Sequence, residues 1–223
     1  MTQEQYLQRG IEIVKILTSF TYQAYLVGGV VRDYLMNNEF NDIDIATNAT
    51  PEQVKELFPN VRMDYAHLGF VTLKEECVTF EISTFREEVY DKPRKPSKIY
   101  YANNLVDDVK RRDFTINAIY LDCSTNQIID PYDGLKDLFT FKIKFIGEPK
   151  ERIKQDPTRI LRGLRLAYKL NFEIEENTNN AFKECFEEIK RLSKTRLNKE
   201  IEKMELELGK EKTESILKLY NID

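Results

Sequence analysis

The stretch that decides the fold is Tyr25-Leu26-Val27-Gly28-Gly29-Val30-Val31-Arg32-Asp33, followed closely by Asp42-Ile43-Asp44-Ile45-Ala46-Thr47. A short apolar strand is predicted to lead into the double glycine, and a helix with an arginine in its first turn is predicted to follow. Residues at i and i+2 of a strand share a face, so Asp42 and Asp44 should present two carboxylates side by side. Such carboxylates repel each other unless a cation, usually a divalent metal ion, lies between them.

The double glycine adds a second piece of chemistry. A glycine turn that feeds a helix N-terminus offers backbone N–H groups to phosphate, which makes Gly28 and Gly29 candidate phosphate-binding residues. A metal site next to a phosphate site indicates phosphoryl or nucleotidyl transfer. A bare Asp-x-Asp is weak evidence for metal, because aspartates are common in turns. The position after the glycine turn is what strengthens the interpretation.

Length and composition exclude several classes of protein. With 223 residues, of which 41% are hydrophobic, the chain can bury a core and suits one large domain or two small ones. We find no apolar run long enough for a membrane helix and no signal-peptide pattern, so no membrane partner is expected. The net charge of −4 indicates that any RNA would be bound by a local basic surface rather than by bulk attraction.

The cysteines favour a cytoplasmic location. Cys77, Cys123 and Cys185 are odd in number and far apart, so neither a disulfide framework nor a zinc site is implied. Three reduced thiols in a cytoplasmic protein are the simplest interpretation.

Periodicity predicts an α+β head followed by a helical neck. Helices are expected over residues 3–20 and 30–36 and after the capping sequence Thr50-Pro51, and strands over 24–27, 61–64, 70–73 and 78–85 in a mostly antiparallel sheet. Residues 86–104 are polar and too long for an ordinary connector, so we expect disorder or a functional loop. Only helical patterns follow Pro149, and Gly209 should separate the last two helices. The predicted domains are residues 1–145 and 146–223.

Two further segments carry candidate site residues in the head. Glu81, in the strand Phe80–Thr84, is a candidate third carboxylate, and an ordinary polar residue on an open sheet face is an equal alternative. The segment Arg111–Ala118 mixes polar and apolar residues without amphipathic order. Arg112 could clamp phosphate oxygens and Asp113 could accept from a ribose hydroxyl. The alternative is a buried Arg–Asp pair that closes the head.

In the neck, Asp156 and Arg159 stand at i and i+3 at the start of a helix. Together they offer an acceptor and a donor fork, which match the amino donor and ring-nitrogen acceptor of cytosine and adenine. Uracil and guanine present the reverse order and would leave buried groups unsatisfied. The alternative is a surface salt bridge between Asp156 and Arg159. When this fragment is considered by itself, the salt bridge is the favoured interpretation. Arg162 lies about 120° and Arg165 about 180° around the helix from Asp156. Arg162 is therefore placed to reach phosphate, and Arg165 to brace the helix or touch RNA.

Together these motifs resemble the class II CCA-adding enzymes and bacterial poly(A) polymerases, a branch of the polymerase-β-like nucleotidyltransferases. The resemblance extends from about residue 22 to about residue 201 and includes Asp130–Gly134, which is similar to the hinge between head and neck. It implies that Asp42 and Asp44 carry Mg²⁺ in a two-metal reaction, with Gly29 and Arg32 on the triphosphate. By the same resemblance, the ribose contacts Arg112 and Asp113, and the base contacts Asp156 and Arg159. Arg162 and Arg165 would assist in the nucleotide pocket.

The resemblance also implies where the chain departs from its relatives. Gln155 stands where the family usually has an acid, and Lys92-Pro93 departs from the usual turn of the family's flexible loop, which serves the switch from C to A addition. Arg196 and Glu200 are similar to the last neck motif. Family members normally continue into body and tail domains that grip tRNA, and a minimal enzyme and a truncation both remain open. We expect part of the contact with tRNA to come from a run of basic residues, namely Lys190, Arg191, Lys194, Arg196 and Lys199. The alternative is that these residues form a solvated helix face.

The leading hypothesis is an enzyme that adds C, C and A to tRNA 3′ ends, using CTP, ATP and Mg²⁺. A poly(A) polymerase, or an enzyme of partial (CC-only or A-only) addition, shares the same motifs. A non-catalytic fragment that binds nucleotide or RNA is the third possibility. The oligomeric state does not follow from the sequence.

Overall fold

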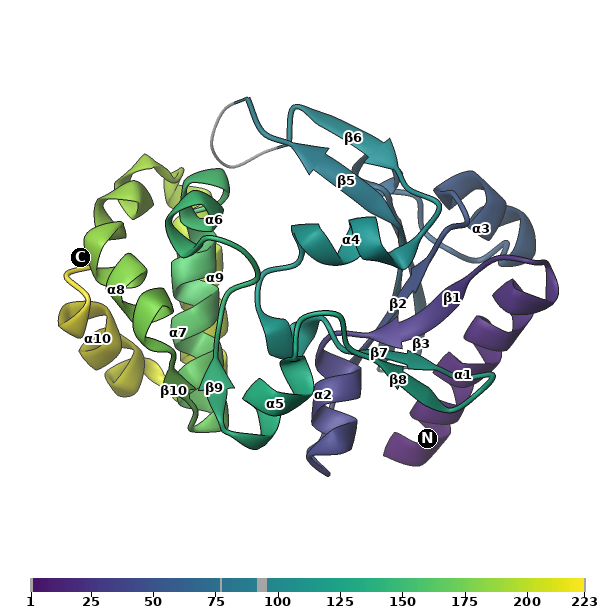
Figure 1. The fold of residues 1–223 in the computed structure, drawn as a ribbon, viewed down its shortest axis with the longest axis horizontal. Coiled ribbons are helices and arrows are strands. Elements are labelled where there is room, and N and C mark those ends of the chain that lie inside the picture. The colour runs from purple at the N-terminus through teal and green to yellow at the C-terminus, as the bar shows by residue number, and fades with distance from the viewer. Residues whose placement is uncertain (1, 77, 92–95, 223) are drawn as a thin grey trace. The chain divides into compact units, whose positions relative to one another are not determined.

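The computed structural model describes residues 2–76, 78–91 and 96–222 of the chain (Figure 1). They form two compact units. The sheet unit comprises Met1–Glu88, Lys98–Arg112 and Ile116–Gly134, and the helical unit comprises Val89–Ser97, Asp113–Thr115 and Leu135–Asp223. The domain boundary expected after residue 145 stays a prediction. None of the helices in the described part of the chain combines the length and hydrophobicity that crossing a membrane requires.

The sheet unit is built on a six-stranded sheet of order β3-β4-β2-β1-β7-β8. Its strands are β1 (Ala24–Val27), β2 (Asp42–Thr47), β3 (Phe70–Glu75), β4 (Val78–Thr84), β7 (Tyr120–Asp122) and β8 (Gln127–Ile129). β2 and β4 are parallel and the other pairs are antiparallel. The helices of this unit are α1 (Gln3–Ser19), α2 (Gly29–Leu35), α3 (Pro51–Leu57) and α4 (Leu105–Arg111), with the 3-10 turns η1 (Ala66–Leu68) and η2 (Thr115–Asn117), the latter beginning in the helical unit.

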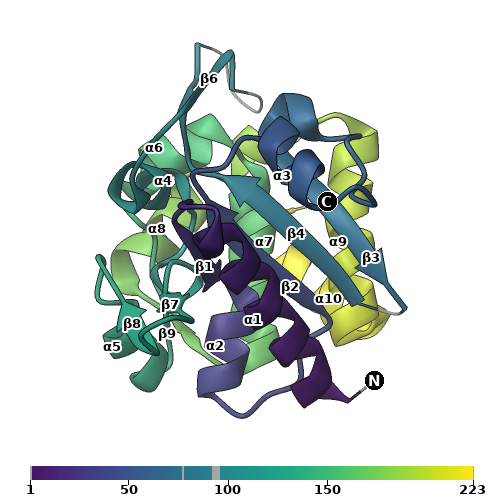
Figure 2. The same cartoon turned by 90° about the vertical axis from the view of Figure 1, so that its right-hand side faces the viewer.

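Helix α1 covers one face of this sheet (Figure 2). A Cβ placed on Gly10 of α1 would lie 3.0 Å from Ile43 Cγ2 and 3.4 Å from Leu26 Cδ2, so these two side chains face the helix. Because side chains alternate along a strand, Asp42 and Asp44 project from the opposite face of β2. One face of β2 therefore packs in the hydrophobic core under α1, and the other face presents the two aspartates.

Local capping decides where α3 begins, as the sequence predicted. The Thr50 hydroxyl accepts from the Gln53 backbone N–H at 3.3 Å, and the Gln53 side chain accepts from the Thr50 N–H at 2.9 Å. This reciprocal pair satisfies two backbone donors that a helix N-terminus otherwise leaves without partners. Gly209 likewise separates the last two helices, as expected.

The helical unit packs its elements around buried aromatic rings. Its helices are α5 (Gly134–Phe139, whose first residue belongs to the sheet unit), α6 (Pro149–Gln155), α7 (Thr158–Leu170), α8 (Glu176–Glu184), η3 (Phe186–Arg191), α9 (Lys194–Leu208) and α10 (Lys210–Leu219). Phe114 stacks on Phe145 at 4.8 Å between ring centroids, and Phe145 meets Phe182 edge-on at 5.7 Å. The expectation of helices alone after Pro149 is wrong at one point, because β10 (Glu173–Ile174) pairs with β9 (Lys142–Ile143).

Two other expectations about strands need correction. Residues 61–64 do not form a strand, since the described pairing there is a single bridge between Arg62 and Thr72. Residues 86–104 contain the two-stranded sheet of β5 (Arg86–Val89) and β6 (Lys98–Tyr101) rather than a continuous loop. Arg86 explains how so polar a strand is accommodated, because its guanidinium donates to the Gly69 carbonyl and pairs with Glu88. Lys92-Pro93, where the sequence departs from the usual turn of the family's flexible loop, lies outside the described residues, as does Cys77.

We predict that Gly163→Ala destabilises the helical unit. A Cβ at this position of α7 would collide with Phe182 Cζ and lie 2.8 Å from Phe114 Cζ. The expected loss is about 1–3 kcal/mol in the free energy of unfolding, because a packed core resists added volume. Urea unfolding of Gly163→Ala, Phe182→Leu and the double variant measures it. The double variant should lose less than the two single losses combined, and wild-type stability in Gly163→Ala would contradict the packing described.

Candidate active site

The two aspartates of β2 stand in a row of side chains that crosses the sheet. Directly opposed residues share a face, and Asp44 is opposite Glu81 of β4 on one side and Val27 of β1 on the other. Val27 in turn is opposite Tyr120 of β7. Asp42, two residues before Asp44, projects from the same face and is exposed. The row Glu81–Asp44–Val27–Tyr120 therefore places the predicted third carboxylate directly beside Asp44.

Asp44 is electrostatically strained in this position. Burial raises the pKa of its carboxyl to about 7, and the negative charges of Glu81 and Asp42 add to the effect, although Arg112 and Arg32 oppose it. Burial also raises the pKa of Glu81, with Arg86, Arg111 and Arg112 opposing. A carboxylate that is desolvated among other carboxylates is stabilised by a bound cation. This face of the sheet thus favours a cation.

Gly28 gives the Asp44 carboxylate room. Its φ is +78°, a conformation that glycine adopts readily, and a Cβ there would lie 2.8 Å from Asp44 Oδ2. Gly29, the first residue of α2, follows directly. The predicted phosphate turn and the predicted metal ligand are therefore in contact.

The donor set fits Mg²⁺ when part of the coordination comes from substrate. Across the described residues, no three His, Cys, Asp or Glu side chains are gathered closely enough to form a metal site by themselves. Mg²⁺ is usually bound through one or two carboxylates together with water and substrate phosphates. Asp42 and Asp44 supply two carboxylates on one face. The raised pKa of Asp44 shows that its ionised form is destabilised in this position, and a bound cation would offset that destabilisation.

Arg32 is held rigidly on α2. Its Nε and Nη2 donate to the two carboxylate oxygens of Asp33 at 2.8 and 2.7 Å, and its Nη1 donates to Asn117 Oδ1 at 2.6 Å. The side chain is almost fully buried. Its positive charge still reaches Asp44, because it opposes the rise in the pKa of that carboxyl.

Arg111 and Arg112 converge on a buried aspartate that the sequence interpretation did not single out. Asp108 Oδ1 accepts from Arg111 Nε at 2.8 Å, and Asp108 Oδ2 pairs with Arg112 Nη2 at 3.1 Å. Burial would raise the pKa of Asp108, but Arg111 and Arg112 outweigh it and the pKa is lowered. The alternative of a buried Arg–Asp pair in this segment thus describes Arg112, with Asp108 rather than Asp113 as its partner.

Asp113 makes its contacts inside the helical unit. Its Oδ2 pairs with Arg162 Nη2 of α7, and its Oδ1 accepts from the Phe114 N–H at 2.8 Å. Burial opposes ionisation, yet Arg162 and the backbone N–H lower the pKa of Asp113. Arg162, expected to reach phosphate from the flank of the helix, thus pairs with the Asp113 carboxylate in this structure, and its contact with phosphate stays a prediction.

Asp156 and Arg159 are buried where α6 gives way to α7. Asp156 Oδ1 accepts from the Thr158 N–H at 3.1 Å and Asp156 Oδ2 from Arg196 at 3.0 Å. Arg159 Nη1 donates to the Arg152 carbonyl at 2.7 Å and to Gln155 Oε1 at 3.1 Å. Both side chains are thus fixed by neighbours of their own, and neither is exposed as a surface salt bridge would be. Gln155 acts as a neutral acceptor for the arginine.

Arg165 braces α7 against α9. It pairs with Glu207 at 2.6 Å, and Lys169 pairs with the same carboxylate at 3.4 Å. Of the two expectations for Arg165, bracing of the helix agrees with this contact.

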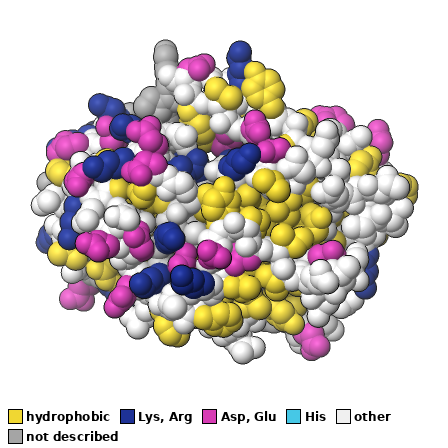
Figure 3. Space-filling view, viewed as in Figure 1, with side chains coloured by type: hydrophobic (Ala, Val, Ile, Leu, Met, Phe, Trp, Pro, Cys, Tyr) yellow, Lys and Arg dark blue, Asp and Glu magenta, His cyan; other side chains and the backbone are white. Residues whose placement is uncertain are grey.

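The five basic residues expected to contact RNA do not lie on one helix. η3 ends at Arg191 and α9 begins at Lys194, because the backbone of Leu192 and Ser193 between them is extended. Lys190 pairs with Glu187, Arg191 pairs with Glu188, and Arg196 binds Asp156. Lys194 and Lys199 are exposed. On the face drawn in Figure 3, basic and acidic side chains alternate over the helical unit instead of forming a patch of one sign.

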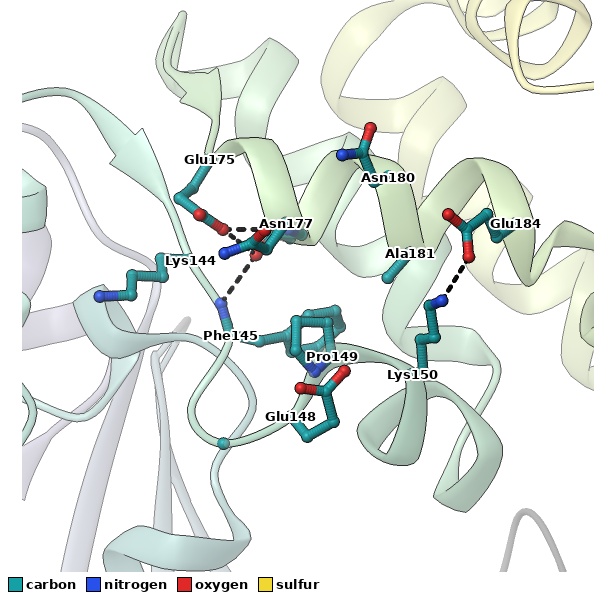
Figure 4. Close-up of a pocket in the computed structure, with 12 residues that line it drawn as sticks. Lys144, Phe145, Glu148, Pro149, Lys150, Glu175, Asn177, Asn180, Ala181 and Glu184 are labelled. Atoms are coloured by element: carbon teal, nitrogen blue, oxygen red, sulfur yellow. Dashed lines mark hydrogen bonds and ion pairs between the residues drawn. The ribbon is translucent and has the colours of Figure 1, made fainter.

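A cavity of about 490 Å³ also lies within the helical unit, between the segment 144–150 and α8 (Figure 4). Several of the polar groups that line this cavity form ion pairs or hydrogen bonds with one another. Lys150 pairs with Glu184 at 2.5 Å, and the Glu175 carboxylate accepts from the Thr178 N–H at 2.9 Å at the start of α8. The described residues that line it include none of the predicted site residues.

Comparison with known proteins decides the family. Residues 24–144, more than half of the chain, match the model of the poly A polymerase head domain. The chain belongs to that family. It is 40% identical over 201 residues to the CCA-adding enzyme of Enterococcus faecalis, a match that covers 89% of this chain and 49% of the relative. The chain thus spans about half the length of the curated relatives it matches.

Solved structures agree with this assignment. The crystal structure of the Bacillus stearothermophilus CCA-adding enzyme in complex with CTP superposes with a TM-score of 0.86 at 30% identity, covering 97% of this chain and 52% of that one. A tRNA nucleotidyltransferase complexed with a primer tRNA and an incoming ATP analog gives 0.74 at 32% identity, over 94% and 59%. The predicted family and the predicted α+β class with a mostly antiparallel sheet are confirmed.

Proposed function

We propose that this chain is a template-independent nucleotidyltransferase that adds C, C and A to the 3′ end of tRNA from CTP and ATP. One observation carries the proposal. Asp42 and Asp44 share a face of β2, with Glu81 beside Asp44 and the Gly28 turn in contact with it. The names of the relatives, CCA-adding enzymes, support the same reaction, and solved relatives in complex with CTP, and with a primer tRNA and an ATP analog, support the same substrates.

In this proposal Asp42 and Asp44 hold Mg²⁺, and Glu81 adds negative charge beside them. When bound, the metal supplies activation of the terminal 3′-hydroxyl and charge stabilisation on the triphosphate. The chain's own groups do the positioning. Gly28, Gly29 and Arg32 flank the carboxylates and are assigned to the triphosphate, since a turn leading into a helix offers N–H donors to phosphate.

The rest of the nucleotide is assigned to two pairs of residues. Arg112 and Asp113 are assigned to the ribose, and Asp156 with Arg159 to the base edge. A carboxylate oxygen has two lone pairs, so Asp156 Oδ2 can accept from a base while it holds Arg196. Arg162 pairs with Asp113, and Arg165 pairs with Glu207. We propose that these two arginines assist the other residues of the nucleotide pocket.

For tRNA we rank the basic residues by their exposure. Lys194 and Lys199 are exposed and are proposed as the stronger contacts, whereas Lys190, Arg191 and Arg196 are paired with acids and must exchange partners to bind phosphate. Each phosphate contact adds to the affinity and to its salt dependence. Because tRNA, CTP and ATP meet in the cytoplasm, we place the activity there.

The test is incubation of the purified chain with tRNA that lacks its terminal CCA and one labelled nucleotide at a time. CTP should be incorporated, ATP should follow once CC is in place, and UTP and GTP should not react. Incorporation of UTP or GTP as readily as CTP would contradict the base assignment. Binding of nucleotide or tRNA without any turnover would instead identify a non-catalytic fragment.

A poly(A) polymerase is the second candidate, favoured by the description of the matching family model. It and the partial-addition enzymes share the same carboxylates. They differ in product, since a poly(A) polymerase extends a 3′ end by many A residues and a partial enzyme stops after CC or after A. Product length on a sequencing gel separates them.

A further inference from the structure

Tyr120 lies in the row of the two aspartates, although no feature of the sequence marked it as a site residue. It is fully buried on β7, and Val27 alone separates it from Asp44 across the strands. Its ring meets Tyr25 edge-on at 6.3 Å between centroids. A buried tyrosine usually finds a hydrogen-bond partner for its hydroxyl. Here the hydroxyl has two.

The Tyr120 hydroxyl connects Arg112 to Asp108. Arg112 Nε donates to it at 2.7 Å, and the hydroxyl donates to Asp108 Oδ2 at 3.0 Å. The guanidinium carbon of Arg112 also lies 5.1 Å from the centre of the ring. Burial and the charge of Asp108 raise the pKa of Tyr120, so the phenol keeps the proton that it donates. Each of the three groups contacts the other two, since Arg112 Nη2 pairs with Asp108 at 3.1 Å.

Arg112 is thereby fixed in two directions. Asp108 holds its Nε and Nη2 from α4, and Tyr120 holds Nε from β7. A long arginine side chain loses conformational entropy when a ligand orders it, and prior ordering by the protein lowers that cost. From this position the charge of Arg112 acts on Asp44.

We propose that Tyr120 is a positioning residue, whose hydroxyl holds the Arg112 guanidinium in the orientation that binds the sugar and phosphate part of an incoming nucleoside triphosphate. The inference rests on the nucleotidyltransferase function proposed above. Tyr120 acts through Arg112 and does not itself contact substrate. A tyrosine that served only as core would be replaced by phenylalanine without effect on nucleotide binding.

The test is Tyr120→Phe, which keeps the ring and removes the hydroxyl. We expect the KM for CTP to rise roughly tenfold, with kcat changed by less than about threefold, because one hydrogen bond to a charged group is lost from the arginine. Hydrogen exchange of the Arg112 Nε–H, followed by NMR in the absence of nucleotide, should become faster. Tyr65→Phe is the matched control, because Tyr65 is 48% exposed on the same unit and should change neither quantity.

These readouts distinguish failure of this inference from failure of the proposed function. If wild-type protein incorporates no nucleotide, the proposed function fails, and the exchange measurement still reports whether Tyr120 holds Arg112. An unchanged exchange rate in Tyr120→Phe, or an unchanged KM in an active enzyme, would overturn the inference even if the variant were less stable.

Coupling to Arg112 provides a second test that does not depend on a single variant. In an Arg112→Lys background, where the Nε–H is absent, Tyr120→Phe should add less than about a twofold further increase in KM, because the two changes remove the same contact. Multiplicative effects of the two substitutions would show that Tyr120 acts independently of Arg112 and would overturn the inference.

Discussion

Asp44→Asn is expected to abolish nucleotide addition and to make the protein more stable. Activity should fall by roughly 1000-fold or more, because the variant loses one of the two carboxylates proposed to hold the metal. Stability should rise by about 1–3 kcal/mol at pH 8, because the variant no longer ionises a half-buried, desolvated carboxyl beside Glu81 and Asp42. Loss of activity together with a gain in stability is typical of a residue kept for function.

The stability gain should depend on pH in a defined direction. The pKa of Asp44 is about 7 in the folded protein and near 3.8 in its ordinary state, so its ionisation costs folding energy as pH rises from about 4 to about 7. Urea unfolding at pH 8 and at pH 4 should therefore show the advantage of Asp44→Asn only at the higher pH. Asp64→Asn is the control, since Asp64 is an exposed partner of Arg62. An Asp44→Asn protein that retained full activity would contradict the metal assignment.

Asp108→Asn is expected to destabilise the sheet unit by about 3–5 kcal/mol, because it leaves Arg111 and Arg112 beside a buried group without charge. An amide also presents N–H donors to the arginine donors. The lowered pKa of Asp108 means that its contribution is complete above about pH 4 and is lost as pH falls further. Guanidinium unfolding at neutral pH measures the loss.

The neighbouring Asp107 provides the control for this prediction. It pairs with Lys110 on the exposed side of α4. Asp107→Asn should leave the free energy of unfolding nearly unchanged, since exposed ion pairs contribute little. Equal effects of the two substitutions would contradict the central place of Asp108 in the sheet unit.

Signals confined to a few residues were sufficient for part of the fold and of the site. The Thr50 capping box predicted the start of α3, and Gly209 predicted the break between α9 and α10. The alternation of side chains along a strand is sufficient to predict that Asp42 and Asp44 share one face of β2. In each case the physical cause lies within about four residues, so the sequence contains it.

Partners that are distant in sequence could not be predicted in this way. Asp113 binds Arg162, which lies 49 residues further along the chain, and nothing near either residue specifies the pair. Tyr120 joins the row of Asp44 through the register of three strands. Asp108 is different, because an acid three and four residues before Arg111 and Arg112 on a helix is a signal that could have identified it.

The most direct measurement of the proposed reaction is the sequence of the product formed on tRNA lacking its terminus, with all four nucleotides and Mg²⁺ present. We expect addition of C, C and A in that order, after which extension stops. We expect no product from Asp42→Asn or Asp44→Asn. A tail containing U or G, a long run of A, or equal product from the Asp44→Asn protein would contradict the proposed reaction.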